Sequence, residues 1–199
     1  MQNAHETVDK SRGERNRTEV KSMKTIILVP TMYSEVDLRE ILSAIPKDFS
    51  KESGEYWTYL EEKLLGAVGT VDMVCLLWFE KTIDVRARML VKVLQNRGAK
   101  VCRPKDNALA GEVRAWHIMV REGKRGVEED LLKESTEELN MVLKGMMGPL
   151  SDGGVGVVFL DPSFKPILAE DFRVIRMAPF DPEDYVLRHL VRQRLAGRT

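Results

Sequence analysis

The distribution of apolar positions predicts alternating strands and helices over residues 25 to 122. The nearly continuous apolar runs are residues 25–29, 71–79 and 99–103. Such runs are typical of strands that are covered on both faces. The segments with helical spacing are residues 34–45, 55–65, 84–97 and 106–120. This alternation predicts right-handed βαβ crossovers and a mainly parallel sheet.

Capping residues sharpen several helix boundaries. Ser34 is expected to cap the first helix, with Asp37 in the capping-box position and Pro46 just past its end. Asp181-Pro182 is a strong start for a C-terminal helix. In the helix over residues 84–97 we expect an inward-facing stripe of Val85, Met89, Val93 and Leu94. In the C-terminal helix the expected buried stripe is Leu187, Leu190, Val191 and Leu195.

The last third of the chain changes character. A long helix is predicted over residues 127–144, followed by strands at 155–160 and 172–177. The turn residues 161–166 between these strands favour an antiparallel hairpin at the edge of the sheet. The predicted fold is therefore a three-layer α/β domain, with a mainly parallel open sheet, an antiparallel edge hairpin and a C-terminal helix.

Composition and charge give expectations about the domain boundary, the binding partners and the cellular location. Residues 1–22 are polar and charged and are expected to form a disordered tail, which leaves residues 23–199 as a single domain. The chain has 31 acidic and 31 basic residues, so net charge gives no indication of nucleic-acid binding. Two cysteines in apolar runs, no run long enough to span a membrane and no signal-peptide pattern together predict a cytoplasmic protein.

Polar residues that follow the predicted strands mark the candidate site. The carboxyl ends of parallel strands meet at one edge of a sheet, so the residues that follow these strands should lie close together there. The candidate catalytic residues are Glu35, Glu80 and Asp106, and the candidate ligand-binding residues are Tyr33, Ser34, Arg103 and Lys105. Hydroxyl groups, basic side chains and helix N-termini can all bind the phosphate of a phosphorylated or nucleotide-like ligand. A group of carboxylates suits Mg²⁺, which is the one cofactor that these residues suggest.

The same residues also have an ordinary structural interpretation. Ser34 and Asp106 cap helices, and Glu35 and Asp37 complement a helix dipole. The sequence therefore supports two functional hypotheses. The first is a domain that binds or hydrolyses a small phosphorylated ligand at the carboxyl end of its sheet. The second is a non-enzymatic interaction or regulatory domain. No metal-ligand spacing among the histidines and cysteines indicates a zinc site, and the sequence leaves the oligomeric state open.

Overall fold

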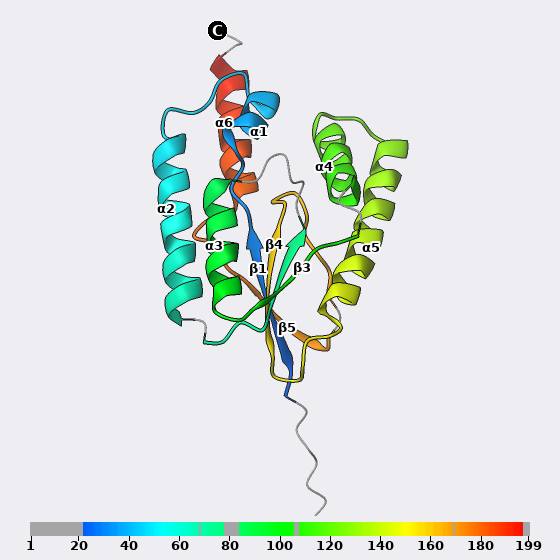
Figure 1. Cartoon of the computed structure of the whole chain (residues 1–199). Coiled ribbons are helices and arrows are strands. Elements are labelled where there is room, and N and C mark those ends of the chain that lie inside the picture. The colour runs from blue at the N-terminus through cyan, green and yellow to red at the C-terminus, as the bar shows by residue number, and fades with distance from the viewer. Residues whose placement is uncertain (1–21, 68, 78–83, 106–107, 169, 197–199) are drawn as a thin grey trace, which may run out of the picture.

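A five-stranded sheet with strand order β3-β2-β4-β1-β5 organises the structure, a computed structural model shown in Figure 1. The residues that it describes are 22–67, 69–77, 84–105, 108–168 and 170–196. The strands are β1 (Lys24–Pro30), β2 (Met73–Leu77), β3 (Lys100–Cys102), β4 (Val155–Leu160) and β5 (Phe172–Arg176). The helices are α1 (Glu35–Ile41), α2 (Phe49–Glu62), α3 (Val85–Asn96), α4 (Ala108–Arg121), α5 (Val127–Met147) and α6 (Pro182–Ala196), and a π-helical turn η1 (Lys63–Ala67) extends α2.

Every neighbouring pair of strands in this sheet is parallel. The predicted α/β fold with a mainly parallel sheet is therefore confirmed, but the predicted antiparallel edge hairpin is wrong. β4 and β5 do not pair with each other, because β5 lies on the far side of β1 and pairs with it in parallel. The segment between β4 and β5 is a crossover without a helix. Phe164 and Leu168 pack it against the sheet and return the chain to the end where β1 begins.

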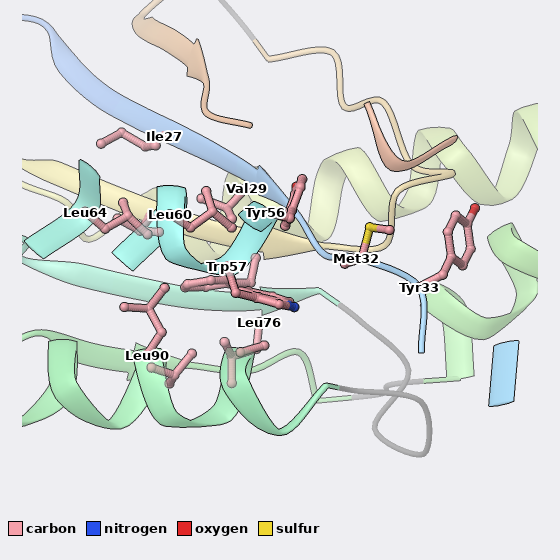
Figure 2. Close-up of a cluster of buried hydrophobic side chains, with 14 of the residues drawn as sticks. Ile27, Val29, Met32, Tyr33, Tyr56, Trp57, Leu60, Leu64, Leu76 and Leu90 are labelled. Atoms are coloured by element: carbon pink, nitrogen blue, oxygen red, sulfur yellow. The ribbon is translucent and has the colours of Figure 1, made fainter. Parts of the chain in front are cut away.

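Helices cover both faces of the sheet, which makes three layers (Figure 1). α1, α2, α3 and α6 pack on one face, and α4 and α5 pack on the other. The first face holds the aromatic residues of α2, Tyr56 and Trp57, which are fully buried. Figure 2 shows them packed with Val29, Leu60 and Leu76, as expected for core residues.

Two of the predicted buried stripes are wrong at three of their four positions, and only Leu94 and Leu190 pack against the core as predicted. On α3, Val85, Met89 and Val93 are exposed, and the buried residues are Ala87, Leu90, Val91 and Leu94. On α6, Leu187, Val191 and Leu195 are exposed, and Tyr185 and Val186 face the core instead. Both helices carry apolar residues on more than one side, so helical spacing alone did not identify the face that packs. Each exposed stripe has the spacing i, i+4, i+8, which aligns its members along one side of the helix.

The chain reverses its crossover direction after β3. The connections that leave β1 and β2 pass over the face covered by α2 and α3, whereas the connection that leaves β4 passes over the opposite face. β2 leads to β3 on one side and its neighbour β4 leads to β5 on the other, so the boundary between β2 and β4 is a topological switch point. Open α/β sheets bind ligands at the carboxyl ends of such strands. α1 and α4 lie near this end of the sheet in Figure 1.

Two further predictions, the disordered N-terminal tail and the absence of a membrane span, can be compared with the structure only over the described residues. Of the predicted N-terminal tail, residues 1–22, only Ser22 lies within the described residues, and its carbonyl accepts a hydrogen bond from the Gly153 amide at 3.0 Å. Among the described helices, none combines the length and the apolar character that a membrane span requires.

Candidate functional site

A cationic face of α4 lies against the carboxyl ends of β1 and β4. Arg114, His117 and Arg121 have the spacing i, i+3, i+7, so they project from one side of the helix. Arg114 forms a buried ion pair with Asp37 of α1, and its Nη1 lies 3.6 Å from Oδ2 of Asp161, the residue directly after β4. The guanidinium therefore connects α4 to α1 and to the end of a central strand.

A second group of polar contacts surrounds Glu183, which lies in the first turn of α6. Tyr33, three residues past the end of β1, donates its hydroxyl hydrogen to Glu183 Oε2. His117 Nε2 lies 3.1 Å from Oε1, and Arg121 Nη1 donates to the same oxygen at 3.0 Å. Burial alone would raise the pKa of Glu183, but the hydrogen bonds from His117 and Tyr33 and the charges of His117 and Arg121 lower it to about 2.

These residues form what we call the buried network: Tyr33, Asp37, Arg114, His117, Arg121, Asp161 and Glu183. Burial raises the pKa of Asp161, although Arg114 and hydrogen bonds from Ser163 oppose this change. Burial and the charges of Asp161 and Glu183 raise the pKa of Tyr33 well above its ordinary value. Among the described residues, every fully buried side-chain nitrogen or oxygen has a hydrogen-bond partner. The buried network therefore joins α1, α4, α6 and the end of β4, and leaves none of its fully buried polar atoms without a partner.

Ser34 links the buried network to an open hollow on its other side. Its amide and hydroxyl donate to Asp37 Oδ2 at 2.9 and 2.8 Å, and its hydroxyl oxygen accepts from the Asp37 amide at 3.2 Å. This is the predicted capping box, and it is confirmed. Ser34 also lines a hollow of about 390 Å³ where α1, α2 and α3 begin, which we call the carboxyl-end hollow. A volume of this order suits a small-molecule ligand.

The carboxyl-end hollow is mainly polar in character. Ser34, Ser50 and Ser53 line it, with Arg86 from the first turn of α3. Arg86 Nη1 donates to the Gly54 carbonyl of α2 at 3.1 Å, which holds the guanidinium between the two helices. Asp84 also lines the hollow, and its carboxylate accepts from the Arg86 amide at 2.7 Å and from Trp57 Nε1 at 3.1 Å. Arginine and serine side chains can together donate several hydrogen bonds to a phosphoryl group.

The structure separates the candidate residues that the sequence groups together. Ser34 and Glu35 line the carboxyl-end hollow, and Glu35 lies 3.8 Å from Arg39 on the surface. Tyr33 belongs to the buried network through its hydroxyl group, and its ring is part of the apolar cluster shown in Figure 2. The other candidates do not line this hollow: Arg103 and Lys105 are exposed after β3, and Glu80 and Asp106 lie outside the described residues.

Sequence reasoning missed most of the buried network. The spacing of Arg114, His117 and Arg121 on one helix was the available signal. Asp161 directly follows a strand and would have qualified under the strand-end rule, but the hairpin interpretation removed it from consideration. Glu183 has the position of an ordinary helix-dipole acid, so its role could only be seen in the structure.

Comparison of the chain with protein-family models, with curated proteins and with solved structures found no match. Within the described part of the chain, no group of three or more His, Cys, Asp or Glu side chains is placed to hold a metal ion. The functional argument therefore depends on the geometry of the hollow and of the network beside it.

Proposed function

We propose that this protein binds a small phosphorylated ligand in the carboxyl-end hollow. The observation that carries the proposal is the lining of this hollow, in which Ser34, Ser50, Ser53 and Arg86 converge from the starts of α1, α2 and α3. The residues that line the hollow include Ser34, which follows β1, and Asp84, which precedes α3, so the hollow lies toward the carboxyl end of the sheet, where ligands of open α/β folds bind. Helix N-termini also favour a negatively charged ligand.

A second hollow gives the ligand room to extend along α2. It measures about 460 Å³ and shares Ser50, Gly54 and Arg86 with the carboxyl-end hollow. Tyr59 lies further along its lining. An aromatic ring there offers a surface for a nucleobase to stack on. The pair of hollows therefore favours a nucleotide-like ligand, with its phosphoryl group beside Arg86.

The buried network supports binding better than hydrolysis. The pKa values of Glu183 and Tyr33 are shifted away from neutrality, whereas a general acid or base works best with a pKa near the operating pH. The pKa of Asp161 is raised, but this carboxylate is paired with Arg114 and Ser163 and does not line the hollow. Asp37 joins the network to Ser34, so the effect of the network on the hollow is to hold Ser34 and the start of α1 in place. Of the three candidate catalytic residues, Glu35 lines the hollow, and hydrolysis there stays a prediction.

Thermal shift measurements with a matched pair of variants test the proposal. The panel contains inorganic phosphate, pyrophosphate and nucleoside mono-, di- and triphosphates, each with and without Mg²⁺. A ligand of the folded state raises Tm by mass action. We expect at least one member to raise Tm of the wild type and of Lys92→Gln, which removes a charge from α3 away from the hollow. The same ligand should not raise Tm of Arg86→Gln. No shift across the panel, or equal shifts in both variants, would contradict the proposal.

One observation favours the alternative function, a protein-interaction domain. The exposed stripe of Leu187, Val191 and Leu195 on α6 has the exposed cations Arg192 and Arg194 beside it. This surface fits a partner segment whose apolar side chains are flanked by carboxylates. A photo-crosslinking side chain at position 191 should capture such a partner in cells, while one at exposed Lys133 on α5 should not. Equal capture at both positions would count against this alternative.

A further inference from the structure

The chain has two cysteines, and the fold places them opposite each other in the sheet. Cys75 of β2 and Cys102 of β3 are register partners in a parallel pair of strands. Register partners project to the same face, and both residues belong to the apolar cluster beneath α4 and α5. Both are free thiols in the structure.

The spacing of this pair suits a covalent bond. Neighbouring strands lie about 4.7–4.9 Å apart, and disulfide-bonded cysteines have Cα atoms about 4.4–6.8 Å apart. Cys102 lies close enough to Cys75 to add to the effect of burial, and both raise the pKa of the Cys75 thiol. We propose that Cys75 and Cys102 form a dithiol site that a small disulfide, such as oxidised glutathione, converts into a reversible intramolecular disulfide.

The two thiols differ in their access to solvent. Cys75 is fully buried in the centre of β2, whereas Cys102 is half-buried at the last residue of β3. β3 is an edge strand, so one side of it is not covered by another strand. Cys102 is therefore the residue that a small disulfide meets first, and Cys75 is the residue that resolves the intermediate.

The reaction has two exchange steps. The Cys102 thiolate attacks the small disulfide, which forms a mixed disulfide and releases one small thiolate. The Cys75 thiolate then attacks the Cys102 sulfur, which forms the internal disulfide and releases the second small thiolate. The two cysteines lose two electrons and two protons in total, the small disulfide gains the electrons, and the protons pass to the released thiolates. Burial and the neighbouring Cys102 raise the pKa of Cys75, so the second step should become faster as the pH rises.

The disulfide would link the two strands on either side of α3, so that α3 would lie within a covalently closed loop. β2 and β3 share only the register from Met73 to Cys75, and β3 leads into α4 through Arg103 and Pro104. A covalent bond between Cys75 and Cys102 would fix this edge strand beside β2. A small dithiol such as dithiothreitol can reduce this bond again by the same thiol–disulfide exchange, so its formation is reversible.

Mass spectrometry of the intact, folded chain tests the proposal. The protein is incubated with oxidised glutathione, its free thiols are alkylated, and circular dichroism confirms that it stays folded. We expect a monomer that has lost two hydrogens and resists alkylation, and that dithiothreitol restores. Cys75→Ala should instead accumulate a stable glutathione adduct on Cys102, and Cys102→Ala should react far more slowly. A wild-type chain that keeps the glutathione adduct, forms a disulfide-linked dimer or reacts only when unfolded would overturn the proposal.

Discussion

Replacing Glu183 by glutamine is expected to destabilise the protein strongly at neutral pH and only weakly in acid. The carboxylate of Glu183 accepts hydrogen bonds from Tyr33 and Arg121 and lies 3.1 Å from His117 Nε2. Its side chain is only 5% exposed, so solvent screens these contacts little. The amide of glutamine keeps the shape of the side chain but removes the charge that attracts Arg121 and His117.

The lowered pKa of Glu183 gives the magnitude. Its contacts outweigh the effect of burial and lower the pKa from 4.5 to about 2. Each pKa unit corresponds to about 1.4 kcal/mol, so the ionised carboxylate contributes about 3 kcal/mol to the free energy of unfolding. Because the pKa in the folded state is below that in the unfolded state, this contribution is complete above pH 4.5. It is lost as the pH falls from there toward about 2.

Urea unfolding of the wild type and of Glu183→Gln at several pH values between about 7 and 3 measures this difference. The gap between the two proteins should be about 3 kcal/mol near neutral pH and should shrink steadily below pH 4.5. Glu35→Gln is the matched control, because that side chain is 62% exposed and should change stability by less than about 0.5 kcal/mol. A gap that stays constant with pH would refute the reasoning about the charge of Glu183.

One further substitution and two matched pairs of substitutions test the fold. Ser34→Ala removes the capping box and should cost about 1 kcal/mol in chemical unfolding. Val186→Thr places a hydroxyl at a fully buried site and should cost about 1–3 kcal/mol, whereas Val191→Thr, at a side chain that is 55% exposed, should stay within about 0.5 kcal/mol. Gly98 has φ +106°, so Gly98→Ala should lower Tm, whereas Gly54→Ala, inside α2 with nothing within 4 Å of the added methyl group, should raise it.

The sequence was sufficient to predict the strands and most helices because their signals are local. Continuous apolar runs identified β1, β2 and β4, and cap residues identified the starts of α1 and α6. The pairing of β5 depends on where the chain travels after Asp161, which is a long-range property. Turn residues at 161–166 are compatible with a hairpin and with a crossover, and the packing of Phe164 on the core decides between them.

The residues of the candidate site likewise fall into those that a local sequence pattern identified and those that it did not. The strand-end rule identified Ser34 and Glu35, which follow β1 and line the carboxyl-end hollow. Ser50, Ser53 and Arg86 lie inside helices, and no local pattern distinguishes them from other surface residues. They reach the hollow only because α2 and α3 pack side by side, as the hydrogen bond from Arg86 to the Gly54 carbonyl shows.

The most direct test of phosphorylated-ligand binding is a backbone-amide NMR titration of the full chain with ADP and Mg²⁺, with inorganic pyrophosphate in parallel. The carboxyl-end hollow predicts saturable shifts that are largest at Ser34, Ser50, Ser53 and Arg86. Shifts centred instead on the hollow near Lys24 and Asp171, at the opposite end of the sheet, would contradict the account. So would a spectrum that does not change with either compound.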